Sequence, residues 1–510
     1  MRQELVVDAY EHETRVALYQ DEILQDVHIE RDGRYSLTGS IYLGRVDRLV
    51  PGIQAAFIEF GRDRPGFLHV RDVVGESVGA VEFDKRRVNE EIPDQSEHPV
   101  DIRSVLHEGQ SVLVQVSKDP IGGKGARLTT NLTLAGRYLV LMPYADRIGV
   151  SQRIRDAAER ERLRSLMETF RHEMSASYGY IVRTVAEGVP IDDLEDDVEF
   201  LERVWHQITE KAKALENGEV VYQELPLHTR AIRDLVNAEV RSIVVNDDAT
   251  LAEVKKFVKS YMPEYLPGVT KATDIENRRR KLDAEIEKAS MRKVMLPSGG
   301  HLLIENTEAL CTVDVNTGRF VGSKNLEDTA FKTNMEAARV IARELRVRNI
   351  GGLVVVDFID MSEVIHRRDV MRVFERSFDG DPSRVQLGDF SEFGLVELSR
   401  KRTRKNLAEQ LGAACSKCGG DGIVKSLETT CFDLFRALHV AMEALGENRG
   451  RELRYLVRAG QEVVDRMLGQ ESDRLEYLNS ESGCELSFEI DKDCAIGEFT
   501  LVQLSDPNAQ

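Results

Sequence analysis

The sequence predicts a multidomain α/β protein with a small β-barrel inserted between its other parts. The chain has 510 residues, more than one hydrophobic core usually organises, so several structural units are expected. Short apolar runs punctuated by glycine, from residue 36 to about 124, are typical of a small barrel. A strand, helix, strand pattern between residues 311 and 357 predicts a crossover unit with parallel neighbouring strands.

The composition is that of a folded protein in water, with 42% hydrophobic and 31% charged residues and no low-complexity tract. No run approaches the roughly 18 apolar residues that a membrane span needs, and the N-terminus lacks the layout of a secretory signal. Six cysteines are too few for a disulfide framework. We therefore expect a cytoplasmic protein with no membrane partner.

The net charge of −19 argues at first sight against a polyanionic partner. Basic residues nevertheless cluster in three runs, at 278–281, 343–348 and 400–405. Phosphate binding depends on the local field, so these runs could line a basic groove within an acidic chain. The charge balance therefore does not exclude a nucleic acid as partner.

The first half of the chain begins with strands. Residues 1–35 alternate apolar and polar side chains, which predicts two or three strands of a sheet completed elsewhere. The barrel that follows is expected to close with the strand in "GQSVLVQVSKDP" at 109–120. A charged helix is predicted at about 155–175, and the span from about 191 to 292 is predicted to be largely helical.

Residues 293 to 412 have the clearest pattern. A hairpin with the turn "PSGG" (297–300) precedes the strand "ALCTVDV". One apolar face of the following helix is predicted to consist of Phe331, Met335, Ala338, Ala342 and Leu345. "NIGG" (349–352) is expected to end this helix as a glycine cap, before the second strand, "LVVVDFID".

Two aspartates are the main candidates for catalysis. Asp314 and Asp357 are predicted to lie late in adjacent parallel strands, so that their side chains meet at one edge of the sheet. Carboxylates without His or Cys nearby suit Mg²⁺ or Mn²⁺, which activates water and neutralises charge on phosphorus. Asn316, on the same face as Asp314, is expected to hydrogen-bond the phosphate or the attacking water.

The alternative is that each aspartate only binds a neighbouring turn. Burying two unpaired carboxylates would cost several kcal/mol each, which favours the metal site. Asp360 is expected to face away from Asp357 and to act as a cap.

Cys415 and Cys418 have the spacing of a zinc knuckle before "GGDG". Two ligands do not close a tetrahedral site, and the chain has no second CxxC. The other two thiolates are therefore expected from another subunit, which would make the zinc a dimer clasp. A redox dithiol and two idle thiols are the alternatives.

Further candidates for binding a nucleic acid lie in the first half of the chain. Phe57 and Phe67 fall in strands that OB-folds use to stack bases, with Lys118 as a neighbour, although a phenylalanine in a small barrel is commonly a core residue. Arg183 and Thr184 could grip a terminal phosphate, although these residues alone favour a solvated arginine.

These motifs, taken together, resemble the ribonuclease E/G endoribonuclease family over nearly the whole chain. The matching stretches include "IYLGRVDRLVPGIQAAFIEFG", "KGARLTT", "TVDVNTGRFVG", "RNIGGLVVVDFIDM", "GLVELSRKRTR" and the CxxCxGxG of "CSKCGGDG". The resemblance implies Mg²⁺-dependent cleavage of single-stranded RNA that leaves a 5′-phosphate and a 3′-hydroxyl. It also implies a role in 5′ maturation of ribosomal RNA and in mRNA decay.

The resemblance implies a role for each candidate residue. The residues implied to hold the catalytic Mg²⁺ and to accompany it are Asp314, Asp357 and Asn316. The pocket that senses a 5′-monophosphate on the RNA would contain Arg183 and Thr184, and other RNA contacts would come from Phe57, Phe67, Lys118 and Arg384. The structural zinc, shared between subunits, would be held by Cys415 and Cys418.

The resemblance also implies how the chain is divided. The implied parts are an RNase H-like scaffold without catalytic use (1–35 plus about 227–290), an OB-fold RNA-binding barrel (36–124), a 5′-phosphate sensor region (125–226), a DNase I-like catalytic subdomain (291–412), a zinc link (413–424) and a small α/β dimerisation domain (425–510).

Two positions depart from the family pattern. Ser416 replaces the usual proline of the knuckle, and Gln152 stands where a longer member has an arginine, so either Gln152 or Arg153 could join the sensor. The chain stops at 510 without the scaffold tail of the longer members, which predicts a homodimer. The alternatives are the catalytic half of a longer member, which would form a tetramer, and a non-catalytic RNA-binding protein that uses only the barrel.

Overall fold

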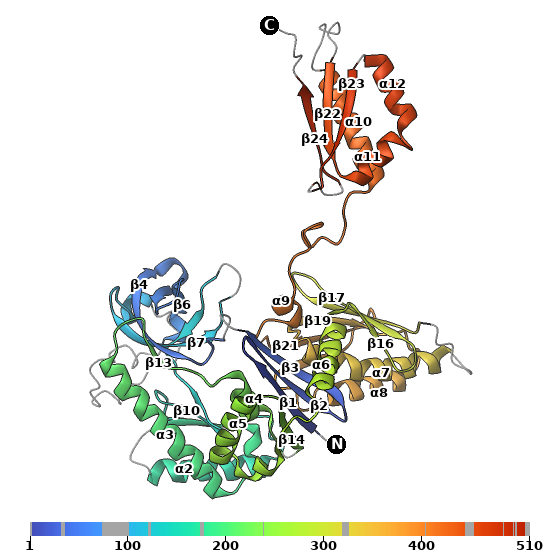
Figure 1. The fold of residues 1–510 in the computed structure, drawn as a ribbon. Helices are drawn as coiled ribbons and strands as arrows, with labels where there is room; N and C mark the ends of the chain where they lie inside the picture. Colours follow the sequence, from blue (N-terminus) through green and yellow to red (C-terminus); the bar gives the residue numbers. More distant parts are fainter. Residues whose placement is uncertain are drawn as a thin grey trace. The chain divides into compact units, whose positions relative to one another are not determined.

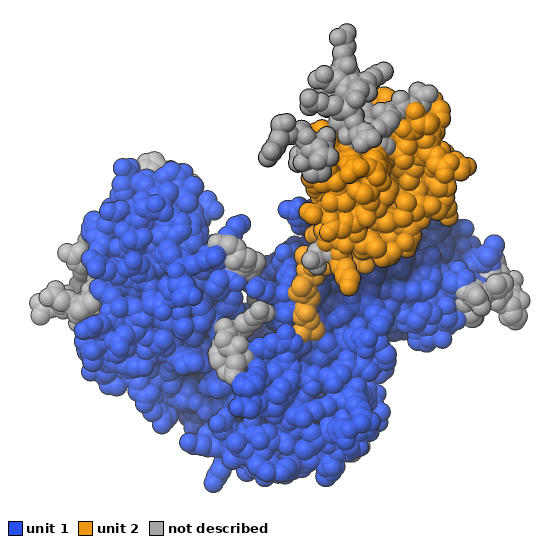
Figure 2. All heavy atoms as spheres, turned by 45° about the horizontal axis from the view of Figure 1, so that its top comes forward, with its two compact units in different colours: residues 1–410 blue, residues 411–510 orange. Residues whose placement is uncertain are grey.

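The structure is a computed structural model, and it describes residues 3–31, 36–73, 101–120, 124–173, 178–237, 239–318, 326–402, 404–443, 453–482, 484–492, 494 and 497–504. Two compact units, residues 1–410 and 411–510, divide the chain (Figure 1; Figure 2). Both mix α-helices and β-strands, and the larger contains a closed barrel. None of the helices in these ranges is long and apolar enough to cross a lipid bilayer.

The first sheet combines two distant segments of the chain. Strands β1 (Gln3–Tyr10), β2 (Glu13–Gln20) and β3 (Ile23–Arg31) form an antiparallel meander. Strands β14 (Val240–Val245) and β15 (Val269–Lys271) extend it in parallel from β1, in the order β15-β14-β1-β2-β3. The N-terminal strands therefore begin a sheet that is completed elsewhere, as predicted.

Three helices accompany this sheet (Figure 1). They are α4 (Leu227–Leu235), α5 (Asp248–Tyr261) and α6 (Ile275–Ser290). The span from 191 to 292 is largely helical, as predicted, although the short runs "VVY" and "VRSIVV" form strands β13 and β14. Their β-branched residues favour the pleated conformation, and pairing with distant strands stabilises it.

The barrel is closed and has five strands. They are β4 (Ile41–Val50), β5 (Ala55–Glu59), β6 (Gly66–His69), β7 (Ser111–Lys118) and β8 (Arg127–Thr129). Pairing of β4 with β7 closes the ring, so β7 is the closing strand that the sequence predicted. Strand β13 (Val220–Tyr222) adds to β4, and the short helix α1 (Ile102–Val105) packs its Ile102 into the barrel core.

A four-stranded sheet follows the barrel. It contains β9 (Leu134–Ala135), β10 (Leu139–Met142), β11 (Ile148–Val150) and β12 (Gly179–Val182), and it packs with helices α2 (Ala157–Glu173) and α3 (Ile191–Ala214). Asp197 of α3 is buried and accepts hydrogen bonds from the backbone N–H groups of residues 137–139. This contact fixes the chain where it enters β10.

The last sheet of the larger unit carries the two candidate aspartates. Its strands are β16 (Lys293–Met295), β17 (His301–Asn306), β18 (Cys311–Asn316), β19 (Gly352–Asp357), β20 (Val385–Phe390) and β21 (Leu395–Arg400). The order is β16-β17-β18-β19-β21-β20. Strands β18 and β19 are parallel and joined through helix α7 (Leu326–Val347), which confirms the predicted crossover. Helix α8 (Val364–Ser377) packs beside α7, and both contribute to the core.

The residue that ends α7 differs from the prediction. Asn349, with φ of +49°, adopts the left-handed conformation, and the N–H of Ile350 bonds the carbonyl of Leu345 at 2.9 Å. Asparagine tolerates this conformation better than other non-glycine residues. Gly351 is needed for another reason, because a Cβ there would lie 2.7 Å from Cγ of Arg402.

The smaller unit is an α/β domain, as predicted. Strands β22 (Leu453–Ala459), β23 (Cys484–Ile490) and β24 (Phe499–Leu504) form its sheet, with β22 in the centre. Helices α10 (Leu427–Glu443), α11 (Gln461–Leu468) and α12 (Ser472–Ser482) pack with it around Leu434, Leu438 and Val457. The helix α9 (Leu407–Leu411) ends at the first residue of this unit.

Candidate active site

The structure brings the two candidate aspartates together. Asp314 of β18 and Asp357 of β19 are register partners in the parallel pair. Both are exposed, whereas Val313 and Val356 beside them are buried in the core that contains α7. Because side chains alternate along a strand, both carboxylates lie on the open face of the sheet, away from that core.

Asn316 belongs to the same cluster. Its Nδ2 donates a hydrogen bond to Oδ2 of Asp314 at 2.7 Å, so it holds that carboxylate in one orientation. Among the residues that the structure describes, none donates to its Oδ1, which can therefore face a ligand or a water molecule.

The carboxylates repel one another. Partial burial and the charges of Asp314 and Asp360 raise the pKa of Asp357. That Asp360 faces away from Asp357 and acts as a cap stays a prediction. The predicted burial was wrong, because both aspartates of the pair are exposed. The repulsion between these carboxylates therefore favours a cation here.

The donor set fits Mg²⁺ in kind. It consists of carboxylate and amide oxygens only, and Mg²⁺ commonly takes one or two carboxylates and keeps several waters. Among the described residues, no group of three or more His, Cys, Asp and Glu side chains is arranged to hold a metal by itself. An ion at this site would therefore complete its shell with water and phosphate oxygens.

Two cationic or polar residues that the sequence interpretation missed flank the pair. Leu303 of β17 is the register partner of Asp314, and Lys293 of β16 is the partner of Leu303. His301 is likewise the partner of Asn316. The alternation within β17 and the short "PSGG" turn could have placed both residues on this face.

The barrel presents a row of aromatic and basic side chains. Phe57 and Phe67 are register partners with ring centroids 6.1 Å apart, and both are partly exposed rather than part of the core. The pairing continues from Phe57 to Arg48 and from Phe67 through Arg127 to Lys118. The Arg48 guanidinium lies 5.1 Å from the centroid of the Phe57 ring. Sequence analysis missed Arg48 and Arg127, because the register of distant strands decides this row.

Arg183 and Thr184 lie at the end of β12. Arg183 donates from Nη1 to the carbonyl of Gly136 and from Nη2 to Oδ1 of Asp234, both at 2.8 Å. Burial by itself would raise the pKa of Asp234, but the charges of Arg233 and Arg183 outweigh burial and lower this pKa. The hydroxyls of Thr184 and Ser151 are 2.9 Å apart. Arg183 is thus positioned by the fold, with Thr184 beside it.

Of the two residues weighed for the sensor, Arg153 donates from Nη2 to the carbonyl of Pro382 at 2.8 Å. Gln152 is exposed.

Arg384 does not lie near the carboxylates of Asp314 and Asp357. Its carbonyl accepts a hydrogen bond from the N–H of Lys401. Lys401 lies six residues after Leu395, and Leu395 is the register partner of Asp357. At about 3.3 Å per residue, this separation is roughly 20 Å.

The cysteine pair forms a tight turn. The N–H of Gly419 bonds the carbonyl of Cys415 at 2.8 Å, and the N–H of Asp421 bonds that of Cys418 at 2.9 Å. The backbone N–H groups of Cys418 and Lys417 lower the pKa of the exposed Cys415 thiol. Amides that stabilise a thiolate suit a metal ligand, so the turn fits half of a tetrahedral zinc site.

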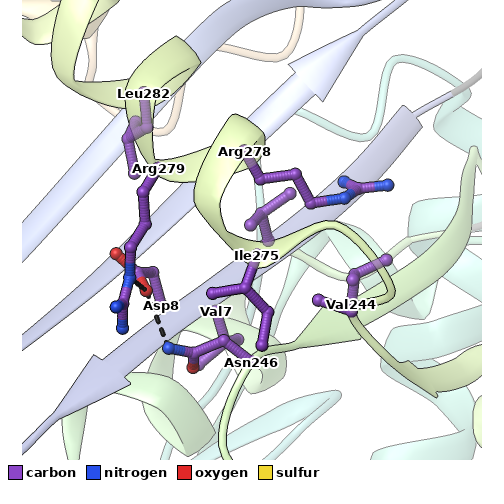
Figure 3. Close-up of a pocket in the computed structure, with 10 residues that line it drawn as sticks. Val7, Asp8, Val244, Asn246, Ile275, Arg278, Arg279 and Leu282 are labelled. Atoms are coloured by element: carbon purple, nitrogen blue, oxygen red, sulfur yellow. Dashed lines mark hydrogen bonds and ion pairs between the residues drawn. The ribbon is translucent and has the colours of Figure 1, made fainter.

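The pocket between β1, β14 and α6 is a poor alternative as a site. Figure 3 shows its Asp8 pointing toward Asn246 and Arg279. The Asp8 carboxylate accepts from Arg279 Nε at 2.7 Å, from Asn246 Nδ2 at 2.8 Å and from Arg15 Nη2 at 2.5 Å. Its charge and lone pairs are thus already engaged.

The three basic runs mostly serve the fold. Arginines of each run pair with acidic side chains of the larger unit, as shown by Arg279 with Asp8, Arg348 with Glu344, and Arg400 with Asp381. These paired arginines are neutralised by their acidic partners, so they do not line the basic groove that the runs led us to expect.

Comparison with known proteins finds relatives that match nearly the whole chain. The sequence model of the "Ribonuclease E/G family" matches residues 133–403. Ribonuclease G of Escherichia coli (strain K12) is 40% identical over 502 residues, covering 96% of this chain and 97% of that protein. Ribonuclease G of Haemophilus influenzae is 38% identical over 441 residues, covering 85% and 87%. Ribonuclease E of Escherichia coli (strain K12) is 35% identical over 88% of this chain and 41% of its own length.

Proposed function

The chain belongs to the ribonuclease E/G family, and from this premise we propose a Mg²⁺-dependent endoribonuclease that cleaves single-stranded RNA. It is a hydrolase of phosphodiester bonds, and the proposed products carry a 5′-phosphate and a 3′-hydroxyl. The observation that carries the proposal is the register pairing of Asp314 with Asp357, with Asn316 bonded to Asp314.

The residues of the open face divide the catalytic work. Asp314 and Asp357 would hold Mg²⁺, which when bound supplies an activated water and neutralises charge on the phosphate. Asn316 fixes the orientation of Asp314 and offers its Oδ1 to the attacking water. Lys293, two strands from Asp314, can offset the charge of the RNA backbone, and His301, the register partner of Asn316, can hydrogen-bond a phosphate.

The barrel supplies affinity without sequence specificity. Phe57 and Phe67 offer ring faces on which bases stack, and the flanking Arg48 and Lys118 attract phosphates, whereas Arg127 is paired with Asp72. This row suits an unpaired strand, since the bases of a duplex are not free to stack on protein side chains.

Arg183 and Thr184 are proposed to sense a 5′-monophosphate on the RNA. Arg183→Gln is expected to lower kcat/KM for a 5′-phosphorylated RNA by roughly 10- to 100-fold, since it removes a charge-assisted hydrogen bond. The rate on the same RNA with a 5′-hydroxyl should stay unchanged. Arg155→Gln, which removes an exposed ion pair with Asp379, is the matched control. An equal loss on both RNAs would contradict a sensing role.

One experiment tests the whole proposal. A short unpaired RNA with a 5′-phosphate or a 5′-hydroxyl is incubated with the full chain, with and without Mg²⁺. Cleavage that requires Mg²⁺ and is faster for the 5′-phosphate is expected. Binding without cleavage under every condition would leave only an RNA-binding protein.

A zinc shared by two copies of the Cys415–Cys418 turn is proposed to clasp a homodimer. Cys415→Ser is expected to release the zinc and to halve the particle mass measured by light scattering, because each copy loses one thiolate and the shared site keeps only two of its four. Cys494→Ser, in the same unit, is the control and should change neither quantity. A Cys415→Ser protein with an unchanged dimer mass would place the dimer contact elsewhere, and a wild-type tetramer would favour the ribonuclease E-like alternative.

The remaining assignments complete the proposal. The first sheet with its helices would be the RNase H-like scaffold, and the sheet of Asp314 the DNase I-like catalytic subdomain. We place the protein in the cytoplasm because its sequence has few cysteines. Its substrates there would be ribosomal RNA precursors and mRNA.

A further inference from the structure

One exposed aromatic residue lies next to the acidic pair and has no part in the function proposed so far. Phe393, in the turn between β20 and β21, is 89% exposed. Single exposed apolar residues are common on protein surfaces, so exposure alone says little. Its backbone support and its position are what distinguish Phe393.

The turn that carries Phe393 is held by four hydrogen bonds. The N–H of Ser391 bonds the carbonyl of Leu395 at 2.8 Å, and the N–H of Gly394 bonds the carbonyl of Ser391 at 3.0 Å. Ser391 Oγ also accepts from the N–H groups of Phe393 and Leu395, at 3.3 and 3.2 Å. Gly394 completes the turn with φ of +79°. The backbone thus fixes an aromatic side chain that projects into solvent.

The turn adjoins the carboxylates. Leu395 is the register partner of Asp357, and a Cβ at Gly394 would lie 3.7 Å from Oδ1 of Asp360. Two peptide units span at most about 7.6 Å, and paired residues lie about 5 Å apart, so Phe393 and Asp357 are within about 13 Å between Cα atoms.

Local charge decides which part of an RNA strand fits this turn. Glu392 is exposed beside Phe393, and the Asp360 carboxylate lies near Gly394 of the same turn, so a backbone phosphate would be repelled at the turn itself. Lys293 and His301 lie on the other side of the acidic pair, where a phosphate is tolerated. A nucleobase carries no net charge, and every base offers a face that stacks on an aromatic ring.

We infer that Phe393 stacks on a nucleobase close to the cleaved bond and so positions the strand over Asp314 and Asp357. The inference rests on the proposed function and extends it, because it adds a base-binding position at the reaction centre to those of the barrel. The stack would hold one side of the scissile phosphate in place and would tolerate any base.

The test uses the full chain and short RNAs with 2-aminopurine at successive positions, bound in EDTA so that no cleavage occurs. The wild-type protein should quench the fluorescence of one base next to the cleavage site, and Phe393→Ala should abolish that quenching. With Mg²⁺, Phe393→Ala should raise KM by roughly 5- to 150-fold, the range for loss of one stacked base. Phe393→Trp should retain both properties.

Tyr477→Ala, which removes an aromatic side chain 67% exposed in the smaller unit, is the matched control. Quenching that is identical in wild type and Phe393→Ala at every position would overturn the inference. A changed particle mass in Phe393→Ala would also overturn it, because the ring would then contact a second copy of the chain. A wild-type protein that fails to cleave RNA would instead refute the proposed function, which keeps the two failures distinct.

Discussion

Asp314→Asn is expected to reduce kcat for RNA cleavage on the order of 10³-fold while RNA binding is retained. The substitution keeps the size of the side chain but removes one of the two charges that would hold Mg²⁺. Metal stabilisation of charge in a transition state is worth several kcal/mol, and each 1.4 kcal/mol is about tenfold in rate. Asp357→Asn should have the same effect, because the two carboxylates act as a pair.

Single-turnover cleavage of a 5′-phosphorylated RNA measures this loss, and fluorescence anisotropy in EDTA measures binding. Glu397→Gln is the matched control, since Glu397 is an exposed acid on the neighbouring strand β21. It should change the rate by less than about threefold, as a surface charge outside the pair. Cleavage by Asp314→Asn at the wild-type rate would show that the reaction centre lies elsewhere.

Replacing Phe57 and Phe67 together by alanine is expected to give the second largest effect, a rise in KM of at least about tenfold. Each stacked base is worth roughly 1–3 kcal/mol, although neighbouring rings are coupled and their effects do not add fully. The kcat at saturating RNA should change little, because neither ring touches the carboxylate pair. Unfolding of the barrel is not expected, since both rings are partly exposed.

The salt dependence of binding separates stacking from charge. The Phe57 and Phe67 variant should keep the wild-type slope of log affinity against log salt, whereas Lys118→Gln should reduce that slope by about one. Ile53→Ala, which removes an exposed apolar side chain of the same barrel, is the control and should leave KM unchanged. An unaltered KM in the double variant would remove the barrel row from the binding surface.

Several features of the fold and the site followed from the sequence. Alternation of side chains along "CTVDVN" placed Asp314 and Asn316 on one face, and the apolar runs on either side of a helix predicted the parallel neighbours β18 and β19. The glycine-punctuated strands predicted the barrel. The CxxC motif with its glycines predicted a tight turn at the two cysteines. In each of these cases, residues close together in the chain determine the outcome, through steric preference and the period of the apolar pattern.

Other features were decided only by the tertiary structure. Whether Asp357 stands directly opposite Asp314, whether Arg48 and Arg127 join the two phenylalanines, and whether the turn before Leu395 adjoins Asp357 all depend on the register between separate strands. That register is set by the packing of whole cores rather than by neighbouring residues. The basic runs show the same limit, since partners from distant segments neutralise arginines that look free in the sequence. The local sequence pattern thus identified the candidate reacting groups, and long-range packing determined which of them lie close together.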